Sequence, residues 1–425
     1  MVLITIFVVG YAAIVFEHAL RLNKAAAALL TGVFAWTAYI AGADPEAANE
    51  KLAHHLGDLS QVLFFLLAAM TIVEVIDAHD GFEVITSRVK TTRRRALLAI
   101  LTGLAFFLSA VLDNLTTSIV MMSLVRRLVP DDEDRMTYAG VIIIAANAGG
   151  VWSPIGDVTT TMLWVGKQIT TTKTMGALFF PALVSVAAPA LWIGWRMKGE
   201  LRRPAAPPEG DEAPAVRTSK TTSRERSLVF FSGLALLLFV PVFKTLTHLP
   251  PVMGILLGLG ALWTLTEVIH KKKDDSLRGS LTVSGALQRV DAQSILFFLG
   301  ILLAITALES DGKLGALAAW LDATVHRVDA VTLLIGLSSS IVDNVPLVAA
   351  AQGMYPMTKF PTDHSFWLFL AYCAGTGGSI LIIGSAAGVA VMGLEKISFG
   401  WYFRRMSLPA LLGYVAGAIA YLATS

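Results

Sequence analysis

Long apolar stretches without Lys or Arg alternate with short charged segments along the whole chain. A stretch of about 20 apolar residues is long enough for a helix to cross the hydrocarbon core of a bilayer, which is about 30 Å thick. The pattern therefore predicts an all-α polytopic membrane protein. The stretches are Val2–Leu20, Ala25–Gly42, Leu59–Asp77, Ala96–Val125, Tyr138–Gly166, Gly176–Trp195, Leu228–Phe243, Val252–His270, Ala292–Glu309, Leu314–Leu321 with Ala330–Ala351, Ser365–Leu394 and Met406–Thr424.

The composition agrees with lipid as the main surroundings of the chain. Of the 425 residues, 55% are hydrophobic and 15% are charged, whereas soluble domains have about 25% charged residues. Val2–Leu20 follows no basic segment and precedes no small-residue cleavage site, so we expect a retained helix rather than a signal peptide. The net charge of +2 does not favour nucleic acid as a partner, and the single cysteine, Cys373, excludes an internal disulfide.

Basic residues predict how the stretches are oriented in the membrane. Of the 33 Lys and Arg residues, 26 fall in six segments that alternation places on one face, and the positive-inside rule makes this face cytoplasmic. The six segments are 21–24, 88–95, 126–135, 196–226, 271–289 and 396–405. Both chain ends then lie on the opposite face. The alternation holds only if 96–129 and 313–351 each enter and leave by the same face, which predicts two re-entrant hairpins.

The two halves of the chain share motifs in the same order. The segments that begin at Asp58, Ser109 and Asn147 resemble those that begin at Asp291, Ser339 and Gly375. The partners are 233, 230 and 228 residues apart, and this nearly constant spacing argues for internal duplication. Because the first motif starts on the outer face and its partner on the inner face, the repeats are expected to have inverted topology. That architecture is typical of secondary transporters.

The predicted domains follow from this duplication. Residues 1–195 form the first inverted repeat and 227–425 the second, each with about five membrane helices, one re-entrant hairpin and one broken helix. The broken helices are 138–166 and 365–394. Between the repeats, 196–226 is rich in Pro, Ala, Thr and charged residues, which predicts a flexible cytoplasmic linker.

An acidic residue lies in the middle of each predicted hairpin. Asp113-Asn114 and Asp343-Asn344 occupy corresponding places, and Thr116 follows the first pair. A charge at membrane depth costs roughly 2.5–3.5 kcal/mol or more, so these carboxylates indicate a functional site, and a cation is the ligand they favour. The alternative is structural, because Asp and Asn are strong helix N-caps and a hairpin tip needs its N–H groups satisfied.

The first broken helix contains a second group of polar residues. Gly149, Gly150, Pro154 and Gly156 should unwind the helix, because proline lacks an N–H donor and glycine exposes the backbone. Oxygen ligands that suit a hard cation surround this break, namely Asn147, Ser153, Asp157, Thr159 and Thr160. The corresponding residues of the second half, Thr376, Ser379 and Ser385, are polar but uncharged.

Two alternatives remain open for these residues. Small residues in both broken helices would also permit close helix packing, which membrane proteins use widely. Glu74 is an accessory candidate for the ion site, but it lies near the end of its span, where its side chain can reach water.

The chain resembles a known family at these residues. Leu112-Asp113-Asn114-Leu-Thr-Thr-Ser, Asn147-Ala-Gly-Gly-Val-Trp-Ser-Pro-Ile-Gly-Asp157 and Val342-Asp343-Asn344 are similar to motifs of the NhaD-type sodium/proton antiporters of the ion transporter superfamily. The resemblance covers nearly the whole chain. It implies a secondary transporter, not an enzyme, that exchanges Na⁺ or Li⁺ for H⁺ by alternating access. It also implies the bacterial inner membrane, periplasmic termini, a homodimer and no cofactor.

The resemblance also assigns the ion and proton site. By similarity, the site comprises Asp113, Asn114, Asn147, Asp157, Thr159, Thr160, Ser339 and Asn344, with Na⁺ held at Asp113, Asn114, Asn147 and Asp157. Relatives that carry dicarboxylates have Ser-Asn-Thr at both hairpin tips, whereas Asp at a tip repels a carboxylate.

Three other functions are alternatives to sodium/proton exchange. A sodium-coupled anion (dicarboxylate) transporter and an arsenite transporter of the same superfamily stay open, although no Lys or Arg lies within a predicted span to hold an anion. Intramembrane aspartyl proteolysis is disfavoured, because Pro154-Ile-Gly-Asp157 does not match its Gly-x-Gly-Asp signature.

Overall fold

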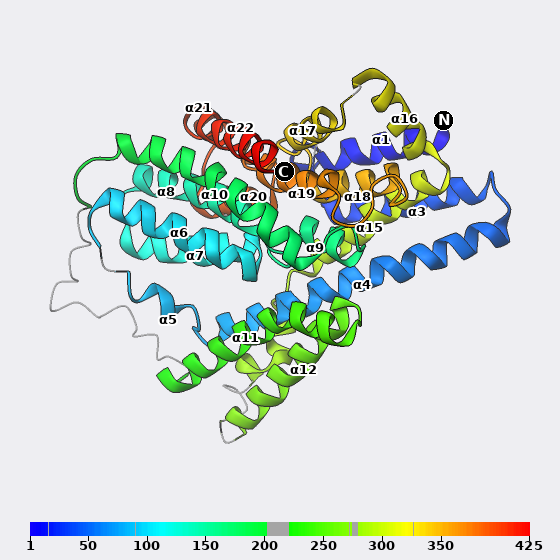
Figure 1. Ribbon diagram of the computed structural model, residues 1–425. Helices are drawn as coiled ribbons and strands as arrows, with labels where there is room; N and C mark the ends of the chain where they lie inside the picture. Colours follow the sequence, from blue (N-terminus) through cyan, green and yellow to red (C-terminus); the bar gives the residue numbers. More distant parts are fainter. Residues whose placement is uncertain (16, 90, 202–220, 272, 274–278, 326) are drawn as a thin grey trace.

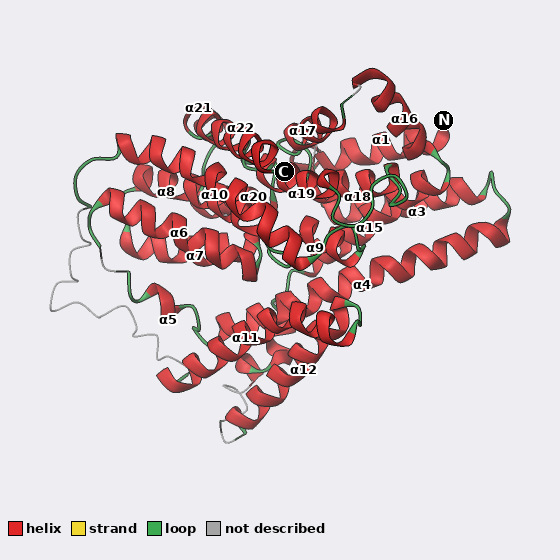
Figure 2. Cartoon of the chain, in the orientation of Figure 1, coloured by secondary structure: helices red, strands yellow, loops and turns green. Residues whose placement is uncertain are grey.

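Helices form the regular secondary structure of the computed structural model (Figures 1 and 2). The structure describes residues 1–15, 17–89, 91–201, 221–271, 273, 279–325 and 327–425. Within these ranges no strand occurs, and seven helices are long and apolar enough to cross a membrane. The prediction of an all-α polytopic membrane protein is therefore confirmed. Most of the predicted linker 196–226 lies outside the described residues.

The helices follow the apolar stretches closely. Those of the first half are α1 (Val2–Val15), α2 (Glu17–Leu20), α3 (Lys24–Ile40), α4 (Pro45–Ala78), α5 (Glu83–Thr86), α6 (Arg94–Leu112), α7 (Asn114–Leu128), α8 (Asp132–Val151), α9 (Val158–Val165) and α10 (Thr171–Arg196). Those of the second half are α11 (Ser223–Thr247), α12 (Pro251–His270), α14 (Val283–Leu287), α15 (Ala292–Ser310), α16 (Lys313–Val325), α17 (Val328–Ser338), α18 (Asn344–Met354), α19 (Ser365–Gly377), α20 (Ala386–Glu395), α21 (Phe399–Arg405) and α22 (Ser407–Thr424).

The two halves of the chain interlock. Helices α1 and α3 of the first half pack on α15 of the second, and α11 and α12 of the second half pack on α4 of the first. Two further pairs, α10 with α22 and α8 with α19, also join the halves. The inverted orientation of the halves in a bilayer stays a prediction.

Helix α4 begins well before its apolar stretch. Asp44 caps the helix by accepting a hydrogen bond from the Ala47 amide (3.0 Å), and Pro45 occupies the first helical position, where its missing N–H costs nothing. The polar turns that follow continue the helix, and Figure 1 shows this end of α4 projecting from the body beside the end of α3. Helix-capping chemistry, rather than hydrophobicity, determines where α4 starts.

The predicted hairpins differ in detail. Stretch 96–129 contains two helices, α6 and α7, which meet at Asp113. Stretch 313–351 contains three helices, because α16 ends at Val325, before the charged residues Arg327 and Asp329. The second helical pair is therefore α17 and α18, joined by residues 339–343. Re-entry of either pair from one membrane face stays a prediction.

Each predicted broken helix contains two helices and a non-helical segment. Residues 152–157 separate α8 from α9, and residues 378–385 separate α19 from α20. A Cβ atom on Gly149 would lie 2.2 Å from the Phe106 carbonyl oxygen, and one on Gly377 would lie 1.9 Å from that of Gly336. Both glycines thus allow the backbone of the preceding predicted hairpin to pack against their helix. The explanation of these two glycines by close helix packing is therefore confirmed.

Replacement of Gly149 by Ala should therefore destabilise the protein. The added methyl group meets backbone that cannot rotate away, and we expect a cost of about 1–3 kcal/mol in the free energy of unfolding. Gly176→Ala in α10 is the matched control, because its Cβ meets no atom within 4 Å. Thermal unfolding of the detergent-solubilised variants, followed by intrinsic fluorescence, measures the difference. Equal transition temperatures would contradict the packing explanation.

Candidate functional site

Asp157 lies where both hairpins and the first broken helix meet. It directly precedes α9, and it is 2% exposed. Its Oδ1 accepts a hydrogen bond from Nδ2 of Asn114 (3.0 Å) at the start of α7, and its Oδ2 accepts one from Nδ2 of Asn344 (3.3 Å) at the start of α18. The Thr159 hydroxyl also donates to Oδ2. One carboxylate therefore connects the tips of the two helical pairs.

Asn147 connects this carboxylate to the second broken helix. Its Oδ1 accepts a hydrogen bond from Nδ2 of Asn114 (3.0 Å). Its own Nδ2 donates to the hydroxyl oxygens of Ser379 (2.9 Å) and Ser385 (3.0 Å), which lie in the segment between α19 and α20. Asn147 is fully buried, so each of these bonds satisfies a polar group that has no access to water.

Ser385 also belongs to this cluster, although the sequence showed it only as an uncharged polar residue of the second broken helix and not as a predicted site residue. It follows Asp157 by 228 residues, the same spacing that separates Asn147 from Gly375, so it occupies the position of Asp157 in the second half. Its hydroxyl also caps α20 by accepting from the Gly388 amide (3.1 Å). The repeat spacing was the available signal, but an uncharged serine gives no sign of an unusual burial cost.

Asp113 acts as a helix cap beside the cluster. Its Oδ1 accepts from the Thr116 amide (2.8 Å) and its Oδ2 from the Thr116 hydroxyl (2.9 Å). The backbone of Asp113 has φ 78°, a conformation that costs a non-glycine residue about 1–3 kcal/mol. Such strain is found mainly at functional sites. Asp113 is thus a helix cap, and its carboxylate lies at the tip of the α6–α7 pair.

Asp343 caps the second tip in the same manner. Its Oδ1 accepts from the Val345 amide (3.1 Å), and its charge is near enough to Asp157 and Lys24 to interact with both. The structure thus brings a second acidic residue to the edge of the cluster without a direct hydrogen bond to Asp157.

The remaining predicted residues support the backbone around the cluster. Each makes a hydrogen bond with a main-chain group: Ser153 with Ile155 N, Thr160 with Asp157 O, Ser339 with Ala374 O and Thr376 with Tyr372 O. Glu74 instead forms an ion pair with Arg289 (2.5 Å) and makes no described bond with the Asp157 cluster. The structure therefore gives Glu74 a partner at a helix end.

A cavity of about 70 Å³ adjoins the carboxylates of Asp113 and Asp157. A water needs about 10–15 Å³ of such space, so the cavity has room for a small cation with some of its waters. Among the described residues, no Lys or Arg lines it. A second cavity of about 170 Å³ lies between the end of α4, α5 and α7, and its lining includes Asp77, Asp80 and Glu83. Both cavities present carboxylates rather than cationic groups, so they suit a cation.

Buried carboxylates at the crossing of interrupted helices are typical of ion-coupled membrane transporters. The comparisons with known proteins agree with this class. Residues 11–369 match the model of a family described as Citrate transporter. "Sodium/proton antiporter 1" of Arabidopsis thaliana is 51% identical over 98% of this chain and 71% of its own length, and "Sodium/proton antiporter 2" of the same plant is 46% identical over 98% of both.

Bacterial proteins match over the same range. The "Na(+)/H(+) antiporter NhaD" of Alkalimonas amylolytica is 30% identical over 99% of this chain and 90% of its own length. The chain therefore belongs to the family described as Citrate transporter and to the NhaD-type sodium/proton antiporters.

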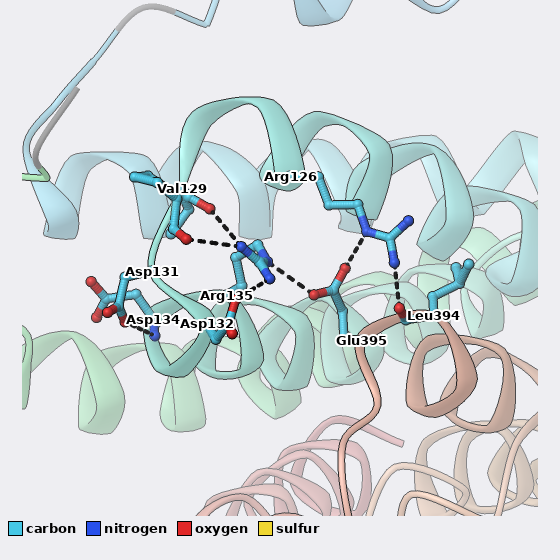
Figure 3. A network of polar contacts seen from close by, with 9 residues as sticks. Arg126, Val129, Asp131, Asp132, Asp134, Arg135, Leu394 and Glu395 are labelled. Carbon is cyan, nitrogen blue, oxygen red and sulfur yellow. Dashed lines mark hydrogen bonds and ion pairs between the residues drawn. The ribbon is translucent and has the colours of Figure 1, made fainter. Parts of the chain in front are cut away.

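A buried glutamate forms ion pairs that join three helices of the candidate site, α7, α8 and α20 (Figure 3). Glu395, the last residue of α20, accepts from Nε of Arg126 in α7 (2.5 Å) and from Nε of Arg135 in α8 (3.0 Å). The Glu395 side chain is 3% exposed. Arg126 also donates to the Leu394 carbonyl oxygen. Because α7 and α20 begin at the Asp157 cluster and end at this pair, Glu395 fixes one helix relative to the other.

Removal of the Glu395 charge should weaken this junction. In Glu395→Gln, Arg126 and Arg135 lose the carboxylate that they share. We expect the free energy of unfolding to fall by about 1–3 kcal/mol. The loss is smaller than for a fully buried ion pair, because the arginines remain partly exposed. Glu133→Gln is the control, since Glu133 and its partner Arg405 are both about two-thirds exposed. Chemical denaturation of both variants in one detergent compares them, and similar losses would show that Glu395 has no special role.

Proposed function

We propose that the chain exchanges Na⁺ or Li⁺ for H⁺ across a membrane by alternating access, with Asp157 as the central ion-binding and proton-binding group. The observation that supports this most directly is the buried Asp157 carboxylate, held by an asparagine from each helical pair and next to a small cavity that Asp113 also lines. Antiporters of plants and bacteria are among the relatives that share nearly the whole chain.

Competition between the two ions gives the exchange. A buried carboxylate is costly when it is charged and alone, and either a bound proton or a bound sodium ion removes that cost. Asn114 and Asn344 each donate a hydrogen bond from Nδ2 to Asp157. Their side-chain amide oxygens can then serve as ligands for a bound cation. Asp157 and Asp113 thus bind Na⁺ or H⁺, and a transport unit that crosses only when neutralised exchanges one for the other.

The site suits a cation better than an organic anion. The family description names citrate, and a citrate ion would need cationic or several neutral donors to hold its carboxylates. Among the described residues, the cavity beside Asp157 has two acidic side chains and no basic one in its lining. A sodium-coupled anion transporter and an arsenite transporter are therefore the second choice.

The finer features of the proposal follow from the bacterial relatives and the basic residues. We place the chain in a bacterial inner membrane as a homodimer, with both termini on the periplasmic side and with each helical pair entering and leaving by the same face. The same antiporter chemistry would serve in a plant membrane, since the relatives also include plant proteins.

Neutralising either central carboxylate should abolish exchange. For Asp157→Asn and for Asp113→Asn we expect the rate of sodium-dependent proton movement to fall at least about 100-fold. The loss of a charged ligand costs about 3 kcal/mol of interaction energy, which corresponds to that factor. Proteoliposomes with a trapped pH indicator, in a medium without organic anions, measure the rate. Glu50→Gln, on the exposed first turns of α4, is the control and should keep the wild-type rate.

The same vesicles separate the alternatives. Exchange with Na⁺ alone, lost in both aspartate variants and kept in the control, supports the antiporter. If the wild-type protein is silent with Na⁺ or Li⁺ and becomes active only when a dicarboxylate or arsenite is added, the antiporter proposal fails and the second choice takes its place.

Asp343 is a third ion-site carboxylate in this proposal. Asn caps helices as well as Asp does, so Asp343→Asn should keep the start of α18 intact and remove only the charge. Since two charges in a partly polar interior interact by about 1–2 kcal/mol, we expect the apparent affinity for Na⁺ to fall roughly tenfold. Isothermal titration with NaCl gives this affinity, and an unchanged value together with unchanged stoichiometry would reduce Asp343 to a helix cap.

A further inference from the structure

An apolar groove runs between α6 and α10. It has a volume of about 730 Å³. Its lining is almost entirely apolar, and small residues make the space: Ala99 and Gly103 from α6, and Ala187, Ala190 and Gly194 from α10. Exposed side chains border it, including Leu191 (74% exposed) and Phe107 (56%).

One end of the groove is cationic. Arg95 lines the groove at the start of α6, and its guanidinium donates from Nε to the Met197 carbonyl oxygen (2.8 Å) and from Nη2 to that of Trp195 (3.0 Å). Two neutral carbonyls orient the guanidinium without neutralising its charge. Arg196 adds a second positive charge nearby, above the ring of Trp192 (4.8 Å).

The same end has the composition of a membrane interface. Trp192 and Trp195 are 40% and 76% exposed, and both lie in the last turns of α10 beside the arginines. Tryptophan and arginine gather at the level of lipid headgroups in membrane proteins. From Arg95 to Phe107 the groove follows about 18 Å of helix, at about 1.5 Å per residue, which is close to half of the ~30 Å hydrocarbon core. Its length thus matches one leaflet.

We propose that this groove binds one phospholipid with an anionic headgroup, its acyl chain lying between α6 and α10 and its phosphate paired with Arg95. The apolar part of the groove corresponds to the acyl chain of a lipid, and the N–H donors of Arg95 at the membrane interface correspond to its headgroup. Guanidinium groups bind phosphate oxygens through paired hydrogen bonds, and the fixed orientation of Arg95 lowers the entropy lost on binding. A second protein would need complementary charge, whereas lipid is present wherever the chain spans a membrane.

Thermal stability in the presence of defined lipids tests the proposal. The purified protein in detergent receives phosphatidylglycerol or phosphatidylcholine with identical acyl chains, and native mass spectrometry counts the lipids retained. A ligand that binds only the folded state raises the unfolding temperature. We expect phosphatidylglycerol to raise it by about 2–5 °C more than phosphatidylcholine does, with one retained lipid.

Two variants separate the headgroup from the acyl chain. Arg95→Gln should erase the preference for phosphatidylglycerol. Gly103→Leu fills the groove, and its Cβ meets no atom within 4 Å, so the protein should fold and lose the stabilisation by both lipids. Arg404→Gln, at another exposed arginine, is the control and should behave as the wild type. Equal effects of the two lipids on the wild-type protein, or a preference that survives Arg95→Gln, would overturn the proposal.

Discussion

One buried carboxylate determines how the centre of this protein is built. Asp157 accepts hydrogen bonds from the first residue of α7 and the first residue of α18, so two helical pairs from different halves of the chain end at a single group. A charge in such a place is stable only if its donors are already positioned. The glycine contacts of α8 with α6 and of α19 with α17 supply that positioning, and the Glu395 ion pair fixes the far ends of α7 and α20.

The sequence was most informative where chemistry and hydrophobicity conflict. A carboxylate inside an apolar stretch is conspicuous, and Asp113, Asp157 and Asp343 were predicted for that reason. The motifs around them were specific enough to indicate the family, which the comparisons confirm. Ser385 has no such conflict with its surroundings, and its place beside Asn147 emerges only when the two halves are packed together.

Other features depend on local helix-capping and turn chemistry that the pattern of apolar stretches does not show. The start of α4 and the separation of α16 from α17 follow from helix capping and a charged turn. Functional and structural explanations also proved compatible in places. Asp113 caps α7 and still lines the cavity, because one carboxylate has enough lone pairs for an amide, a hydroxyl and a further ligand. The roles of helix cap and ion ligand are therefore compatible at Asp113.

The interlocking of the halves has a consequence for biosynthesis. Helix α3 packs along α15, yet about 250 residues separate the end of one from the start of the other. At a synthesis rate of about 5–20 residues per second, α3 waits about 13–50 s in the membrane before its partner is made. During that time its small-residue face, with Ala28 and Gly32 that later meet the backbone of Gly300, is covered by lipid or by the insertion machinery. Completion of the fold must therefore displace whatever occupied that face first.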